Sequence, residues 1–254
     1  MKILYTIIFL LIGFVLGSFY NVLGMRIPKK ENFIISRSKC PNCKHELRFI
    51  EMIPVLSYIF LKGKCKYCKH KISVFYPIIE LFTGLLFAVS FYSFGFSLEL
   101  LLILSTVSFL MIVIVSDLLY LIIPDGIIIF FSLLVIIIKA FIVKFNFLLI
   151  IKFLGSGFLM FMIMYLLMKL GDFIFKKESL GGADVKLMFY VGMLLGPILS
   201  IFTIFLSALI ALPIALFLYF KSKDKIIPYG PFILIALLLV MYFKIDLNLL
   251  NNLL

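Results

Sequence analysis

Charge is scarce in this sequence. Asp, Glu, Lys and Arg make up 14% of its 254 residues, whereas hydrophobic residues make up 65%. Because an ordinary soluble domain is only about half apolar, this composition excludes that class. Apolar runs of roughly 20 residues, the length that crosses a bilayer, recur along the chain with polar breaks between them. The sequence therefore predicts an all-α polytopic membrane protein.

Acidic residues are especially few: 12 of them stand against 24 lysines and arginines, which gives a net charge of +12. In a membrane protein an excess of basic residues is typical of cytoplasmic loops, which orient the chain in the bilayer, and of contact with anionic membrane lipid. No nucleic-acid-binding module is recognisable in the sequence. The first apolar run lacks a small-residue cleavage site, so we expect a retained helix over residues 3–23 and no removed signal peptide. Internal repeats and glycine-rich cofactor motifs of the soluble type are also missing.

One long hydrophilic stretch, Arg26 to Ser73, carries twelve basic and three acidic residues. The positive-inside rule places this stretch in the cytoplasm and the N-terminus outside. About eight transmembrane helices are predicted, at 3–23, 76–94, 98–116, 126–143, 146–169, 187–198, 200–220 and 229–243. The breaks at 117–125, 171–186 and 221–231 then also face the cytoplasm.

The apolar run 187–220 is predicted to be two short crossings with a hinge at Gly196-Pro197. Basic clusters flank this run on both sides, and a single crossing would leave one cluster outside; they contain Lys176, Lys177, Lys186, Lys221, Lys223 and Lys225. Proline is tolerated at such a hinge where neighbouring helices satisfy the freed backbone groups. Three lysines fall on the outer side and disagree with the rule: Lys139, Lys144 and Lys244.

The four cysteines of the chain form two Cys-x-x-Cys knuckles, Cys40-Pro-Asn-Cys43 and Cys65-Lys-Tyr-Cys68. This spacing is typical of a structural zinc site with four thiolate ligands, and it predicts a zinc-ribbon-like cytoplasmic loop. Two disulfides are the alternative, which a reducing cytosol disfavours. His45 and His70 follow the knuckles and are interpreted as surface residues, with a role as substitute ligands left open. A closed site of this kind folds the loop and leaves no position for substrate.

Six ionisable residues lie inside or at the edges of apolar spans: Glu80, Glu99, Asp117, Asp125, Asp184 and Lys186. Each costs free energy at membrane depth, so each is a functional candidate. Asp117 and Asp184 are expected at the cytoplasmic ends of different spans, where they can face each other. Two carboxylates in a poorly hydrated site share one proton and act as general acid and general base on one water molecule. The sequence thus predicts aspartic-protease chemistry at Asp117 and Asp184.

Residues near this pair are predicted to support it. Asp125 follows Asp117 by eight residues, which in a continuous helix gives about 12 Å of separation, so these two cannot easily form one dyad. Gly181 and Gly182 lack Cβ atoms, so they let a substrate backbone approach closely or let the chain turn sharply into the next helix. Lys186 either polarises the dyad or extends its ammonium group to the interface.

The chain resembles a known family in five stretches that follow the family's order. They are "GSFYNVLGMRIP" (17–28), the loop with "CPNC" and "GKCKYC", "YPIIELFTG" (76–84), "SDLLYLIIPD" (116–125) and "GGADVKLM" (181–188). The family is that of the type IV prepilin leader peptidases, which are membrane aspartic proteases of the GxGD class. Asp117 and Asp184 match its catalytic pair, and Asp125 matches its second, non-catalytic aspartate.

The resemblance implies a bifunctional enzyme of the bacterial inner or plasma membrane. It would cleave the basic leader from prepilins or pseudopilins on the cytoplasmic side and then methylate the new N-terminus with S-adenosylmethionine. Residues 1–95, with the zinc loop at 26–75, would form the methyltransferase part, and residues 96–254 the peptidase part. Two positions depart from the family pattern: Ala183 replaces the last glycine of GxGD, and Phe75 stands where many members have arginine.

Arg26 and Glu80 each end a span at the cytoplasmic face, and we expect them to pair. Two roles stay open for this pair: it takes part in methyl transfer, or it only orders the loop. Three other functions stay open: a peptidase without methyltransferase activity, a non-catalytic scaffold of a pilus or secretion system, and a proton-coupled transporter. The scaffold predicts that Asp117→Asn is silent, and the transporter predicts carboxylates at mid-membrane and internal repeats.

Overall fold

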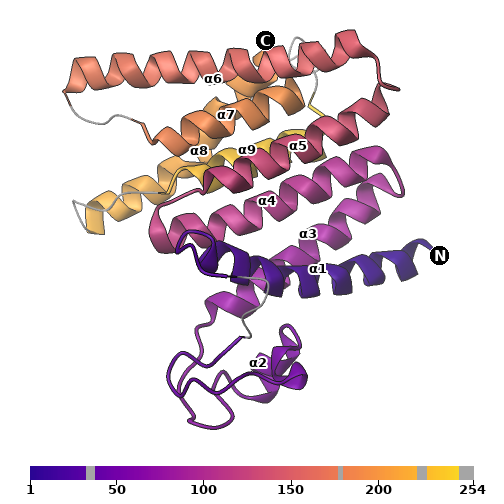
Figure 1. Cartoon of the computed structure of the whole chain (residues 1–254), viewed down its shortest axis with the longest axis vertical. Helices are drawn as coiled ribbons and strands as arrows, with labels where there is room; N and C mark the ends of the chain where they lie inside the picture. The colour runs from indigo at the N-terminus through magenta and orange to yellow at the C-terminus, as the bar shows by residue number, and fades with distance from the viewer. Residues whose placement is uncertain (33–37, 177–179, 222–227, 246–254) are drawn as a thin grey trace. The chain divides into compact units, whose positions relative to one another are not determined.

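The computed structural model is helical, and no strand occurs within residues 1–32, 38–176, 180–221 and 228–245, which are the residues that the structure describes (Figure 1). Several basic residues of the predicted cytoplasmic clusters lie outside these ranges: Arg37, Lys177, Lys223 and Lys225. The all-α membrane fold predicted from the apolar runs is confirmed.

All eight predicted apolar segments form helices, and two short helices occur in the hydrophilic loop. The apolar helices are α1 (Lys2–Arg26), α3 (Phe75–Phe94), α4 (Leu98–Tyr120), α5 (Asp125–Ile142), α6 (Phe147–Phe175), α7 (Gly182–Leu195), α8 (Pro197–Lys221) and α9 (Gly230–Tyr242). Between α1 and α3 lie the 3-10 helix η1 (Phe49–Met52) and α2 (Leu56–Phe60). Sequence analysis did not foresee these two.

Six of the described helices are long and apolar enough to cross a membrane: α1, α3, α4, α5, α6 and α8. With 14 and 13 residues, α7 and α9 are about 21 and 20 Å long, shorter than a hydrocarbon core of about 30 Å. The predicted hinge between α7 and α8 is confirmed, because α7 ends at Gly196, whose φ is +78°, and α8 begins at Pro197.

The chain divides into two compact units, Met1–Leu100 and Leu101–Leu254. In the first unit, α1 and α3 pack in antiparallel directions through small residues. A Cβ added at Gly13 would lie 2.6 Å from the Cα of Gly84, and one at Gly17 would lie 2.8 Å from the Cα of Glu80. The GxxxG spacing of Gly13 and Gly17 thus serves close helix packing, as is typical of membrane helices.

In the second unit, α7 packs against α5, α6, α8 and α9 (Figure 1). Its Tyr190 is fully buried and meets α4 at two points: the Thr106 hydroxyl lies 2.9 Å from the Tyr190 hydroxyl, and the Phe109 ring lies edge-on at 4.8 Å. Gly192 lies against Gly157 of α6, where an added Cβ would come within 2.9 Å of the Gly157 Cα. The apolar sequence of α7 therefore reflects burial among other helices.

A lysine holds the C-terminal end of α7. Lys139 of α5 donates from Nζ to the backbone carbonyls of Met193 and Leu194, each at 2.7 Å, and its ammonium lies 4.0 Å from the centre of the Phe153 ring. The last carbonyls of a helix lack partners within the helix, and a cation there also interacts favourably with the helix dipole. Lys139 therefore caps the C-terminal end of α7.

Candidate active site and metal centre

Asp117 and Asp184 come together in the second unit. Asp117 lies in the last turn of α4 and is 6% exposed, and Asp184 lies in the first turn of α7. The two side chains are near enough for the charge of Asp117 to act on the carboxyl group of Asp184. Asp117 and Asp184 thus lie at neighbouring ends of two helices, and their action as a pair stays a prediction.

The start of α9 also lies beside Asp117. The backbone N–H of Gly230 faces the Asp117 carboxylate. A Cβ added at Gly230 would lie 2.5 Å from Ile123 Cδ1, 3.2 Å from Leu187 Cδ1 and 3.3 Å from Asp117 Oδ2. Only glycine therefore fits at this position without displacing its neighbours.

A tyrosine next to this glycine also reaches the site. The Tyr229 hydroxyl lies 2.6 Å from the Ser207 hydroxyl of α8, and burial and the charge of nearby Asp184 both raise the pKa of Tyr229. Sequence analysis missed Tyr229, Ser207 and Gly230, because "PYGP" was interpreted only as a break between spans. The one available signal was a glycine between prolines at the cytoplasmic edge of an apolar run.

The glycines before Asp184 have different surroundings. A Cβ at Gly181 would lie 2.9 Å from Asp184 Oδ2, whereas one at Gly182 would meet nothing within 4 Å. Gly181 has a φ of −65°, which any residue can adopt, so the chain needs no left-handed turn here. What Gly181 provides is space for the Asp184 carboxylate.

Asp125 and Lys186 form an ion pair, with 2.7 Å between Lys186 Nζ and Asp125 Oδ1. Both side chains are about half exposed, and the pair joins the first turn of α5 to the first turn of α7. Asp125 is separated from Asp117 by a break in the helix at Leu121, where φ is +54°. The structure therefore gives Asp125 a basic partner at the edge of the site.

The four cysteines gather in one cluster, with all sulfur atoms within 4.8 Å of one another. Cys40 Sγ lies 3.8 Å from Cys68 Sγ, and Cys43 Sγ lies 4.0 Å from Cys65 Sγ. Four sulfurs at about 2.3 Å from a tetrahedral zinc ion are about 3.8 Å apart, whereas a disulfide is about 2.0 Å long. The spacing fits zinc, and the four cysteines are free thiols in this structure.

The two knuckles have the same backbone hydrogen bonds. The N–H of Cys40 donates to His45 and the N–H of Cys65 donates to His70, each to the backbone carbonyl at 2.9 Å. The backbone N–H of His70 lowers the pKa of Cys68 to about 6, which favours the thiolate that zinc binds. The His45 ring packs on Tyr67 with 3.7 Å between ring centres, and among the described residues the metal-binding cluster comprises only cysteines.

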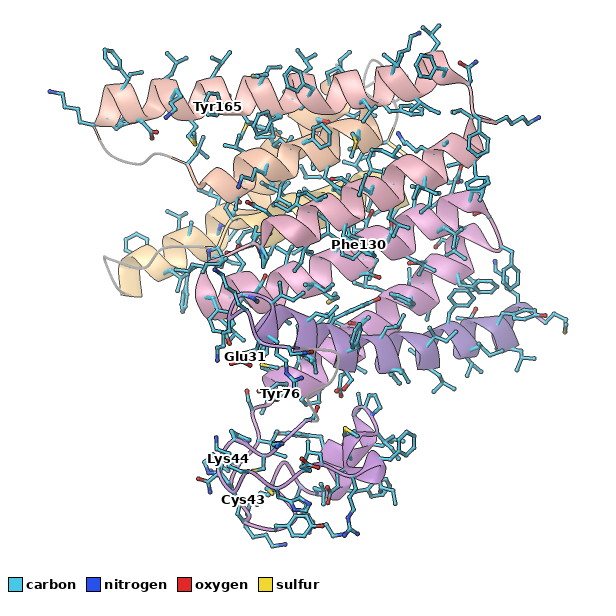
Figure 2. All side chains as sticks on the ribbon, in the orientation of Figure 1. Glu31, Cys43, Lys44, Tyr76, Phe130 and Tyr165 are labelled. Atoms are coloured by element: carbon cyan, nitrogen blue, oxygen red, sulfur yellow. The ribbon has the colours of Figure 1, made fainter. Side chains whose placement is uncertain are left out.

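A polar cluster lies between α1 and α3 in the first unit. Glu80, 8% exposed, accepts a hydrogen bond of 2.7 Å from the N–H of Val55 and interacts with the Ser18 hydroxyl. Asn21 is 3% exposed; its Nδ2 donates to the carbonyl of Tyr76, which Figure 2 labels, and its Oδ1 is buried without a partner. Val55 has a φ of +61°, a strained conformation for a β-branched residue.

The expected partner of Glu80, Arg26, donates from Nη1 to the backbone carbonyl of Asn32 at 3.3 Å. The Glu80 carboxylate instead interacts with Val55 and Ser18. Glu80 therefore holds the turn before α2 against α3. Asn21 was not among the residues that the sequence singled out, although it lies within a stretch that carried the family resemblance.

Comparison with known proteins decides the family. Two family models match: the Bacterial Peptidase A24 N-terminal domain over residues 11–94, and the Type IV leader peptidase family over residues 104–216. A prepilin leader peptidase/N-methyltransferase of Pseudomonas putida is 31% identical over 222 residues, which are 85% of this chain and 76% of that protein. The chain belongs to the type IV leader peptidase family. The resemblance seen in the sequence is thereby confirmed.

Other members of the type IV leader peptidase family with the same printed name match shorter or more distant stretches. One from Stutzerimonas stutzeri is 28% identical over 89% of this chain and 86% of its own length. One from Bacillus subtilis (strain 168) is 42% identical over 49% of this chain, and the match spans only 50% of that protein. No solved structure matches the chain. The two family models meet between residues 94 and 104, where the two units also divide.

Proposed function

We propose that this protein cleaves the basic leader peptide of type IV prepilins or pseudopilins at the cytoplasmic face of the bacterial inner membrane, and then N-methylates the new N-terminus. The observation that carries the proposal is the meeting of Asp117 and Asp184 at adjoining helix ends in a member of the type IV leader peptidase family. The full-length relatives carry both activities in their names.

Peptide hydrolysis needs one carboxylate and one carboxylic acid. Asp117, which faces the Gly230 N–H, acts as the general base: it removes a proton from water as the water oxygen attacks the scissile carbonyl carbon. Asp184, which keeps the shared proton, donates it to the leaving nitrogen as the C–N bond breaks. A proton then returns from Asp117 to Asp184 to restore the pair.

Substrate binding rests on apolar packing. A prepilin is a membrane helix with a basic extension, and this chain is itself basic, with a net charge of +12. The two proteins therefore repel each other at long range. The substrate's apolar helix must therefore supply the binding free energy by packing against helices of the peptidase unit. The ion pair between Asp125 and Lys186 fixes the starts of α5 and α7 while that helix enters.

Methyl transfer is assigned to the first unit, with Glu80 and Asn21 as the polar groups. A buried amide oxygen without a partner fits a donor that is brought by a ligand, because an unsatisfied acceptor costs free energy. Asn21 Oδ1 would accept an N–H, and the Glu80 carboxylate would face a cationic group. S-adenosylmethionine, when bound, supplies the methyl group. Arg26 takes a positioning role through the segment that it holds at Asn32.

Zinc has a structural role in the proposal. Cys40, Cys43, Cys65 and Cys68 would hold one ion and fold a loop that is too basic and too short to build its own core. Four protein ligands leave no open position at the metal, so the ion takes no part in either reaction.

The test is mass spectrometry of the N-terminus of a co-expressed prepilin. Wild-type enzyme should remove the leader and add the mass of one methyl group in place of hydrogen, whereas Asp117→Asn and Asp184→Asn should leave the leader in place. Glu99→Gln, an exposed acidic residue at the other end of α4, is the matched control and should process the prepilin normally. Unchanged processing by both aspartate variants would contradict the mechanism, and cleavage without methylation in wild type would favour a peptidase alone.

A further inference from the structure

The zinc loop carries an exposed apolar surface on its two short helices. η1 and α2 contact each other, and their outward residues are large and hydrophobic. We define the η1–α2 patch as Phe49, Ile50 and Met52 of η1 with Leu56, Ile59 and Phe60 of α2. Phe49 and Phe60 are 80% and 79% exposed, and Ile50 is 76% exposed. Such a cluster outside the spanning helices marks an interaction site.

Basic residues lie beside the patch: Arg48 lines a hollow with Phe49 and Met52, and four lysines line another with Phe60. Residues 38–74 contain eight lysines and arginines, at 39, 44, 48, 62, 64, 66, 69 and 71, and two glutamates, at 46 and 51. The glutamates are used within the loop: Glu46 pairs with Lys39 at 3.2 Å, and Glu51 accepts the backbone N–H of Arg48 at 2.9 Å. The surface offered to a partner is therefore apolar with a basic margin.

The connectivity of the loop keeps it at the membrane. The chain enters it from α1 and leaves it into α3, and both helices are long and apolar enough to cross a bilayer. A folded loop held at both ends by spanning helices stays near the lipid headgroups. Aromatic and aliphatic side chains beside lysine and arginine are the combination that binds the interface of an anionic membrane.

We propose that the η1–α2 patch inserts into the interface of the membrane that carries the protein, with its basic margin on anionic lipid headgroups. Charge favours anionic lipid over the other partners that could cover the patch. A basic leader peptide and a second copy of this basic loop would each be repelled, whereas anionic lipid is attracted. Docking would fix the height of the zinc loop above the bilayer. The inference concerns the loop alone and does not depend on the proposed enzymatic activities.

The chain contains no tryptophan, so one substitution creates a single fluorescent probe. Phe49→Trp and Phe60→Trp place it in the patch, and Tyr67→Trp places it in the second knuckle as the control. Each variant is reconstituted in vesicles of brominated phosphatidylcholine, with and without phosphatidylglycerol. Brominated acyl chains quench tryptophan only on close approach. Zinc content per chain verifies that each variant has folded its loop.

Quenching should be roughly twofold greater or more at positions 49 and 60 than at position 67, as expected for side chains inserted about 5–10 Å into the interface. It should increase with phosphatidylglycerol and lose that increase at high salt, because salt screens the basic margin. Absence of quenching at 49 and 60 would overturn the proposal. So would equal quenching at 67, or quenching at 49 and 60 that appears only when a prepilin peptide is added.

Discussion

Gly230 lies against Asp117: its backbone N–H faces the Asp117 carboxylate, and a Cβ added there would be 3.3 Å from Asp117 Oδ2. The two residues are far apart in the sequence and come from the ends of α4 and α9. An aspartate at a helix end is free to adopt several rotamers, so a fixed backbone donor determines where its carboxylate points. The short helix α9, which is too short to cross the membrane as a regular helix, therefore has a clear role in the site.

Gly230→Ala should reduce leader cleavage by about 10- to 100-fold, because displacement of a catalytic group by about 1 Å has effects of that order. The added methyl group meets Ile123 Cδ1 at 2.5 Å and Asp117 Oδ2 at 3.3 Å, so the Ile123 side chain has to turn away and the carboxylate has to shift. The measurement is the cleavage rate of a purified prepilin in detergent. Gly126→Ala, in the first turn of α5, adds its methyl group to open space and should keep the wild-type rate. Equal rates for the two variants would show that the close contact between Gly230 and Asp117 is unimportant.

Gly181→Ala and Gly182→Ala should differ although they change adjacent residues of one motif. The Gly181 variant pushes on Asp184 Oδ2, which an added Cβ would approach to 2.9 Å, so we expect cleavage to fall about tenfold or more. The Gly182 variant meets nothing within 4 Å and adds a better helix former at the first position of α7, so the free protein should be no less stable. A loss of cleavage in Gly182→Ala with unchanged stability would show that the substrate backbone approaches this position.

Much of this fold follows from local sequence signals. Apolar runs located the eight apolar helices, and the knuckle spacing located the cysteine cluster. The hinge at Gly196-Pro197 followed from the basic clusters on both sides of the run. The meeting of Asp117 and Asp184 followed from topology, because both end a helix at the same predicted face. These features depend on residues close in sequence or on the side of the membrane to which a helix end belongs.

Other features could not be predicted, because they depend on packing between distant segments. Hydropathy cannot distinguish a helix in contact with lipid from one buried in protein, so the short, buried α7 was counted as a crossing. The sequence predicts Lys139 at the outer side of the span 126–143, against the charge rule, and gives no sign that it caps the end of α7. Gly230 and Tyr229 carry no motif that indicates their distance from an aspartate in α4. The apolar residues of η1 and α2 were hidden by the strongly basic composition around them.

Lys139→Met should lower the stability of the second unit by about 1.5–3 kcal/mol, the range for hydrogen bonds to a charged group. Methionine keeps most of the apolar stem but leaves the carbonyls of Met193 and Leu194 without their donor. The measurement is the midpoint of thermal unfolding in detergent. Lys144→Met, at an exposed position just after α5, is the matched control and should unfold at the wild-type temperature. Equal midpoints would mean that the α7 end does not need its cap.

Cys65→Ser should remove zinc and separate the two activities. Three thiolates bind the ion far more weakly than four, and without metal the knuckles lose the contact that folds them, because metal binding and folding are coupled in such small sites. We expect zinc content to fall to near zero and methylation of a cleaved pilin to stop, whereas leader cleavage in the second unit should continue at a similar rate. His45→Gln is the control, because the metal-binding cluster comprises the four cysteines and the ring of His45 packs on Tyr67. Retention of zinc in Cys65→Ser, or its loss in His45→Gln, would contradict the assignment of ligands. Loss of cleavage together with methylation would instead show that the peptidase unit depends on the folded loop.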